Sequence, residues 1–128
     1  MNAPEKIAAD AQARWMAAFG QDFAALAALY EPRAFLFGSK RDLFHTREEV
    51  RAYFEGFPAG MLRKARCYDQ HAHALGHDVI ITAGYVIFTV VKDGVEQDLD
   101  YRISFTLVKR GDTWMIASHH ASPRVETL

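Results

Sequence analysis

Cysteine is almost absent from this chain of 128 residues, which contains only Cys67. A disulfide within the chain is therefore excluded, and the fold needs no oxidising compartment. An excess of charge of one sign is also lacking, because the formal net charge at pH 7 is -1. Such a balance provides no general attraction for nucleic acid or for an anionic membrane surface. We therefore expect neither of them as a partner.

Long apolar runs are missing as well. No stretch approaches the ~20 apolar residues of a membrane span, and residues 1–15 lack the uninterrupted apolar segment of a secretory signal. This predicts a cytoplasmic protein. Half of the residues are hydrophobic and 24% are charged, which is typical of a globular protein. The length predicts a single domain over residues 1–128. No dinucleotide-binding fingerprint occurs, so we expect no such cofactor.

Helical periodicity dominates the first part of the chain. Apolar residues at helical spacing predict one helix over residues 7–19 and a second over residues 22–30, and "RAFLFGS" (33–39) predicts a short strand. The string "TREE" has the pattern of a capping box, with Thr46 as the N-cap residue and Glu49 at the third helical position. An apolar stripe follows it, which predicts a third helix with one buried face.

The rest of the chain has the pattern of strands. Glycines in "LGHD", "KDGV" and "KRGD" separate runs rich in β-branched and aromatic residues, as hairpin turns require. These turns predict a four-stranded antiparallel meander over residues 63–75, 78–91, 96–109 and 113–121. Helices followed by an antiparallel sheet indicate an α+β fold with the helices packed on one face of a curved sheet. Strand 78–91 is apolar on both sides, which predicts that the other face pairs in a homodimer.

The terminal string "WMIASHHASP" changes from apolar to polar along one predicted strand. Strict alternation places on one face Trp114, Ile116, Ser118, His120 and Ser122. An apolar face that becomes polar near its end is suited to a pocket with a few convergent hydrogen-bonding groups. The alternative is a terminal strand that becomes solvated as it leaves the sheet. We favour the pocket, although whether His119 or His120 faces it is not determined.

Two further groups of residues in the sequence bear on chemistry. His71 and His73 are two residues apart, so both point to one side of a strand together with Asp69, and a terminal histidine is a conceivable third ligand. Nothing fixes that third ligand, and we predict histidines on the outer sheet face and no metal site. Cys67 lies mid-strand without a cationic neighbour on its own face, which indicates an unreactive thiol.

Four strings carry a resemblance to a known superfamily: "LYEPRAFLFGS" (29–39), "REEVRAYFEGF" (47–57), "AGYVIFTVVKDG" (83–94) and "YRISFTLVKRGDTWMIASHHAS" (101–122). They resemble the nuclear-transport-factor-two-like superfamily, and within it the SnoaL-like, association-domain-like set of calcium/calmodulin-dependent protein kinase II (SgcJ/EcaC-type proteins). The resemblance implies a cone-shaped fold in which a curved sheet encloses a pocket. It also implies that Arg102 occupies a position often taken by arginine.

The chain is also similar to the iota-type carbonic anhydrases. That branch typically ends in three histidines and two serines and works without a metal through hydroxyl groups in the cone. Tyr53 and Ser122 match its pattern, whereas Ser118 and Ala121 depart from it, and Ser39 stands where threonine is common. The resemblance therefore gives metal-free hydration of CO₂ as one alternative function.

These arguments lead to a small-molecule-binding pocket protein, with a hydratase- or isomerase-like enzyme using acid–base chemistry as its catalytic form. An oligomerisation module without catalysis is the remaining alternative. The expected ligand is a small molecule, and no cofactor or metal is expected. The expected catalytic residues are Tyr53, His120 and Ser122, and the expected ligand-binding residues are Ser39, Tyr85, Arg102 and Trp114.

Overall fold

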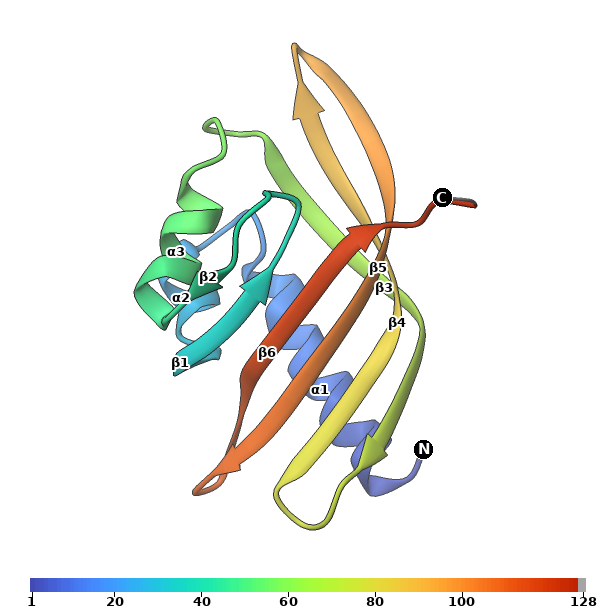
Figure 1. Cartoon of the computed structure of the whole chain (residues 1–128). Coiled ribbons are helices and arrows are strands. Elements are labelled where there is room, and N and C mark those ends of the chain that lie inside the picture. The colour runs from blue at the N-terminus through green and yellow to red at the C-terminus, as the bar shows by residue number, and fades with distance from the viewer. Residues whose placement is uncertain (127–128) are drawn as a thin grey trace.

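The computed structural model describes residues 1–126, which form three helices and six strands. In chain order these are α1 (Ala3–Ala18), α2 (Phe23–Ala27), β1 (Tyr30–Phe37), β2 (Phe44–His45), α3 (Arg47–Glu55), β3 (Leu62–Ala74), β4 (Val79–Lys92), β5 (Val95–Arg110) and β6 (Thr113–Pro123). The strands form one sheet in the order β2-β1-β6-β5-β4-β3 (Figure 1). Neighbouring strands are antiparallel except β1 and β6, which are parallel.

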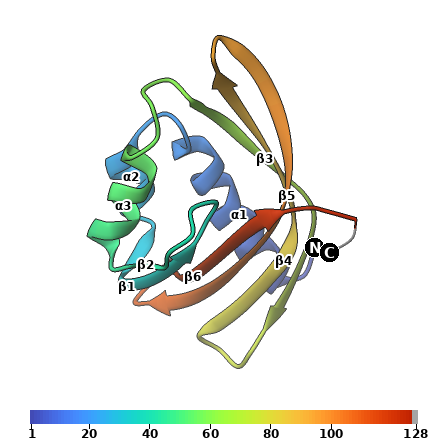
Figure 2. The ribbon, with the colours of Figure 1, turned by 45° about the horizontal axis from the view of Figure 1, so that its top comes forward.

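The helices lie on one side of the curved sheet, with α1 crossing it and α3 standing beside β1 and β2 (Figure 2). We call the face toward the helices the inner face and the opposite one the outer face. This arrangement confirms the predicted α+β fold. The core between the layers centres on Trp15, which is fully buried among aromatic rings. Across residues 1–126, no helix has both the length and the apolar character needed to span a membrane.

The capping box forms at the start of α3. The Thr46 hydroxyl accepts from the backbone N–H of Glu49 at 3.3 Å, which satisfies a free N–H of the first helical turn. The Glu49 carboxylate accepts in return from the backbone N–H of His45 at 2.9 Å. Thr46 itself has φ 89° and ψ 152°, a backbone conformation that a β-branched residue rarely adopts. The box therefore fixes where α3 begins and holds Thr46 in a strained conformation.

The structure differs from the sequence-based prediction around β1. The second helix ends at Ala27, and Tyr30 begins a strand of eight residues instead of ending a helix. That strand pairs with β6 on one side and with β2 on the other, so the four-stranded meander is extended to six strands. Pairing with β6 is a contact between chain segments almost ninety residues apart, which local periodicity does not report. The meander itself and its glycine turns are confirmed, for example at Gly94 with φ 76°.

One irregularity in β6 determines which side chains face the helices. Thr106 of β5 pairs with Ser118, but its neighbour Leu107 pairs with Ile116, so β6 holds one extra residue at Ala117. Such a β-bulge reverses the alternation of the strand beyond it. Ile116 is therefore buried on the inner face before the bulge, and His119 is buried on that face after it. Strict alternation from Trp114 predicts the opposite for every residue after 117.

Candidate functional site

A cavity of about 140 Å³ lies between the inner face of the sheet and helices α1 and α3. We call it the inner cavity. Most of its wall is apolar, with contributions from Phe19, Phe54, Phe57, Phe88 and Leu99. The polar side chains in the wall that concern its chemistry are Ser39, Tyr53, Tyr101 and His119. None of the described residues lining it is an aspartate, glutamate, lysine or arginine, so the wall carries no permanent charge.

Tyr53 of α3 brings its hydroxyl to the loop that follows β1. The Tyr53 oxygen accepts from the backbone N–H of Ser39 at 2.8 Å and lies 3.1 Å from the Ser39 hydroxyl. The approach requires a glycine at position 38, because a Cβ there would overlap the Tyr53 hydroxyl. Since the tyrosine oxygen already accepts from an N–H, its own hydrogen remains available for Ser39 or for a ligand. Tyr53 and Ser39, both predicted as site residues, therefore meet at the inner cavity.

Tyr101 of β5 adds a third hydroxyl to the wall of the cavity. Burial raises the pKa of its phenol, the neighbouring Tyr53 raises that pKa further, and the Ser39 hydroxyl offsets part of the rise. The phenol of Tyr101 is therefore neutral at physiological pH. Tyr101 was not among the predicted site residues, although alternation along its strand places it on one face with Leu99, which also lines the cavity.

His119 of β6 is the fourth polar residue of the cavity and is almost fully buried. Its Nδ1 lies 2.8 Å from the Tyr30 hydroxyl, whose oxygen accepts from the indole N–H of Trp15 at 3.0 Å. Burial, with a smaller contribution from the neighbouring His120, lowers the pKa of His119 to about 3. The imidazole is therefore neutral at physiological pH, and its Nε2 has no hydrogen-bond partner among the described residues.

Lys40 lies against an aromatic cluster formed by Phe44, Tyr53 and Phe57. Its ammonium group is 4.6 Å from the ring centre of Phe57 and 5.2 Å from that of Tyr53. It also donates to the backbone carbonyl of Tyr53 at 3.3 Å. Cation–π contacts of this kind fix the position of an aromatic side chain. Lys40 therefore supports Tyr53 and Phe57 from behind and does not line the cavity.

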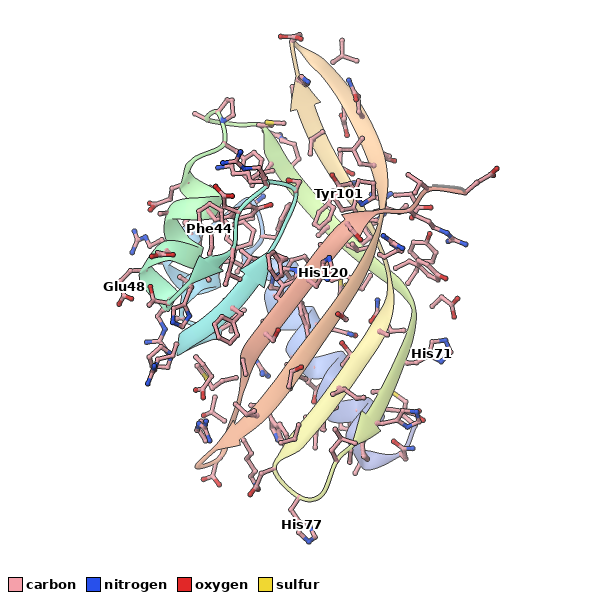
Figure 3. All side chains as sticks on the ribbon, in the orientation of Figure 1. Phe44, Glu48, His71, His77, Tyr101 and His120 are labelled. Atoms are coloured by element: carbon pink, nitrogen blue, oxygen red, sulfur yellow. The ribbon has the colours of Figure 1, made fainter. Side chains whose placement is uncertain are left out.

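Four predicted site residues lie elsewhere, on the outer face. His120, Ser122, Arg102 and Tyr85 line a shallow groove there, together with Asp69 and His71. Figure 3 shows His120 on the strand β6 and His71 at the far edge of the sheet, on β3. The prediction that His120 and Ser122 point into the cone was wrong, because the bulge at Ala117 reverses the alternation of β6. The imidazole that the cavity receives is that of His119.

The side chains of these residues make their contacts on the outer face. Arg102 donates from Nη2 and Nε to the hydroxyl of Ser122 at 2.9 Å and 3.2 Å, since the two residues pair directly across β5 and β6. The guanidinium of Arg124 lies 4.0 Å from the ring centre of Tyr85. The four predicted site residues Tyr85, Arg102, His120 and Ser122 therefore do not line the inner cavity.

Trp114 lies on the inner face, as predicted, but at the opposite end of β6 from the cavity. It pairs with Lys109 next to the β5–β6 turn and packs against the core. The structure therefore places it outside the wall of the inner cavity.

The histidine pair and the cysteine show no arrangement for chemistry. Nε2 of His71 lies 3.2 Å from the Asp69 carboxylate on the exposed outer face. Within residues 1–126, no three histidine, cysteine, aspartate or glutamate side chains are grouped to hold a metal ion. Burial raises the pKa of the Cys67 thiol to about 12, so its nucleophilic thiolate form is scarce at neutral pH.

Comparison with protein families gives one clear match. The model of the SnoaL-like domain family matches residues 9–126, which is nearly the whole chain. A comparison with curated proteins gives no match.

Solved structures share the fold. A protein from Xanthomonas campestris, described as a calcium/calmodulin dependent protein kinase II association domain, is 26% identical with a TM-score of 0.80, covering 96% of this chain and 86% of its own. A ketosteroid isomerase-like protein from Erwinia carotovora atroseptica is 18% identical with a TM-score of 0.85, covering 98% and 100%. A protein from Catenulispora acidiphila in complex with S-DNPA is 16% identical with a TM-score of 0.79, covering 91% and 90%. The predicted NTF2-like, SnoaL-like assignment is confirmed.

Proposed function

The chain belongs to the SnoaL-like domain family, and we propose that it binds a small uncharged molecule, about the size of a single ring, in the inner cavity. The observation that carries this proposal is an apolar cavity of about 140 Å³ whose described lining contains no aspartate, glutamate, lysine or arginine. An apolar cavity of about 150 Å³ is large enough to hold benzene. A charged ligand is disfavoured, since burying a charge without a counter-ion costs several kcal/mol or more.

Ligand binding by a protein of this fold supports the proposal. The Catenulispora acidiphila protein, which shares the fold at 16% identity, holds S-DNPA. An oligomerisation module without a ligand needs no cavity, and tight packing there would be more stable, because empty apolar volume lowers the free energy of unfolding. The inner cavity therefore favours ligand binding over that alternative.

Binding also agrees better with the polar groups than catalysis by acid–base chemistry does. Hydration of CO₂ and isomerisation of a carbonyl compound both need a group that accepts a proton near neutral pH. The described lining contains no carboxylate, and the pKa of His119 is lowered to about 3 by its burial. Its Nδ1 is also occupied by the Tyr30 hydroxyl. Hydroxyl groups such as that of Tyr53 orient a ligand but are poor bases.

A fragment titration tests this function. Addition of cyclohexanone or benzene to the ¹⁵N-labelled protein should shift the amide resonances of residues around the inner cavity, with Ala121 and Leu99 among them. Ala121→Leu extends a side chain from the cavity wall and should weaken binding at least about tenfold by filling the space. Ala13→Leu, on the exposed surface of α1, is the matched control and should bind as the wild type does. Shifts confined to the outer face, or equal binding by both variants, would refute the proposal.

We also propose that two copies pair through their outer faces. Phe35 and Phe37 of β1 are each 47% exposed there, and Ile81 of β4 is 37% exposed. Phe35 and Phe37 are neighbours on one face of β1, and adjacent exposed apolar side chains are typical of a surface that another protein covers. This homodimer would leave the inner cavities at the helix side of each copy.

A further inference from the structure

We propose that Tyr30 is a positioning residue that holds His119 as a neutral Nε2–H hydrogen-bond donor, and that the inner cavity therefore selects uncharged ligands with a carbonyl-type acceptor. The second half of this inference rests on the proposed function. The first half concerns the free protein and stands on the contacts of Trp15, Tyr30 and His119 alone.

The direction of the hydrogen bonds follows from the chemistry of the three groups. The indole N–H of Trp15 only donates, and it lies 3.0 Å from the Tyr30 oxygen. That oxygen therefore accepts from Trp15. The one hydrogen of the Tyr30 hydroxyl is then directed to the nearest acceptor, Nδ1 of His119 at 2.8 Å. Trp15 and Tyr30 are both fully buried, so water does not compete for these bonds.

The tautomer of His119 follows from that direction. A neutral imidazole has one N–H and one acceptor nitrogen, and because Nδ1 accepts here, the hydrogen is on Nε2. The charged form would need both nitrogens to donate, and the Tyr30 hydroxyl would then lose the acceptor for its own hydrogen. Burial disfavours the cation as well and lowers the pKa of His119 to about 3.

The Nε2–H is left without a protein partner. It is buried and makes no hydrogen bond to any described residue, although the ring lies in the wall of the inner cavity. Buried polar groups are paired in most proteins, so an unpaired donor beside a cavity indicates a partner that enters the cavity. A carbonyl oxygen is such a partner, because it is uncharged and only accepts.

Tyr53, another polar residue of the cavity wall, also has a hydrogen to donate. The Tyr53 oxygen accepts from the backbone N–H of Ser39 at 2.8 Å, which leaves its own hydrogen for the Ser39 hydroxyl or for a ligand. The inner cavity thus offers donors from two elements, α3 and β6, and no carboxylate acceptor among its described residues. A ligand whose polar groups only donate, such as an alkylammonium ion, would find few acceptors there.

The first experiment determines the tautomer directly. Two-bond and three-bond ¹H–¹⁵N correlation spectra of the ¹⁵N-histidine-labelled protein at pH 7 report which ring nitrogen carries the proton. We expect His119 to be protonated at Nε2 in the wild type. Tyr30→Phe keeps the ring but removes the hydroxyl, so the Nδ1–H form should become populated and the Trp15 indole N–H resonance should shift. Tyr85→Phe, on the outer face, is the control and should change neither signal.

The second experiment compares two ligands of one shape. Cyclohexanone carries a carbonyl oxygen, and methylenecyclohexane has a CH₂ group in its place. We expect the ketone to bind about tenfold more tightly to the wild type, the value of one hydrogen bond of ordinary strength. In Tyr30→Phe the preference should fall to about threefold or less, because part of the population no longer offers the Nε2–H.

The outcomes separate the two halves of the inference. An Nδ1–H or doubly protonated His119 in the wild type would overturn the role of Tyr30, whether or not any ligand binds. Equal affinity for the two compounds would overturn the acceptor preference. It would mean that the Nε2–H faces only aromatic rings such as that of Phe105, whose ring centre lies 4.8 Å from that of His119 in an edge-on arrangement. Failure of both compounds to bind would overturn the proposed function and would leave the tautomer result standing. If Tyr30→Phe does not fold, the wild-type spectrum still decides the tautomer.

Discussion

The stability of the protein should depend on pH through the buried imidazole of His119. Burial lowers the pKa of this imidazole to about 3 in the folded chain, whereas a histidine in an unfolded chain has a pKa of about 6.5. The unfolded state therefore binds a proton more readily. The stability contributed by the neutral ring is fully present above pH 6.5 and is lost progressively as the pH falls toward 3.

The magnitude follows from the size of this window. Each pH unit below the unfolded pKa lowers the free energy of unfolding by about 1.4 kcal/mol, as long as the folded ring stays neutral. Lowering the pH from 7 to 5 should therefore cost about 2 kcal/mol through His119 alone. This value depends on the unfolded pKa and changes little if the folded pKa lies anywhere below about 4.

Urea unfolding at pH 7 and pH 5, at one fixed protein concentration, measures this effect. Carboxylates and the exposed histidines contribute to the pH dependence of every variant, so the informative quantity is the difference between variants. Between pH 7 and pH 5, the free energy of unfolding of His119→Gln should fall by about 2 kcal/mol less than that of the wild type. His77→Gln, at the exposed β3–β4 turn (Figure 3), should keep the full drop of the wild type. An equal drop in the wild type and in His119→Gln would show that the buried ring is not held neutral.

Three further results are expected. Thr46→Ala should lower the free energy of unfolding by about 1 kcal/mol in urea because the cap of α3 is lost, whereas Thr46→Gly should raise it by about 1 kcal/mol because φ 89° suits glycine. An unchanged midpoint in both variants would contradict this account of the N-cap. Gly38→Ala should displace the Tyr53 side chain and weaken cyclohexanone binding at least about tenfold, with a melting temperature that falls by only a few degrees; unaltered affinity would count against Tyr53 as a ligand contact. Light scattering at micromolar concentration should give the mass of a dimer, and Phe37→Glu should give that of a monomer, since a charge would be buried between the outer faces. A monomeric wild type would exclude the proposed pairing.

Local patterns in the sequence were sufficient for most of the elements, and a family resemblance added two residues that line the inner cavity. The string around Thr46 and Glu49 predicted the start of α3, because a capping box is made by residues three positions apart. The glycine turns predicted the meander of β3 to β6, because a hairpin turn is also made by residues close together in the sequence. Tyr53 and Ser39 were predicted through a family resemblance, and they meet at the inner cavity.

The rest of the site was decided by the tertiary structure. The bulge at Ala117 depends on how β6 fits against β5 and β1. Because of this one extra residue, His119 and not His120 faces the cavity. The hydrogen-bonded chain of Trp15, Tyr30 and His119 joins α1, β1 and β6, so no local pattern contains it. Sequence periodicity reports the backbone geometry of single elements, and these contacts exist only because packing brings distant elements together.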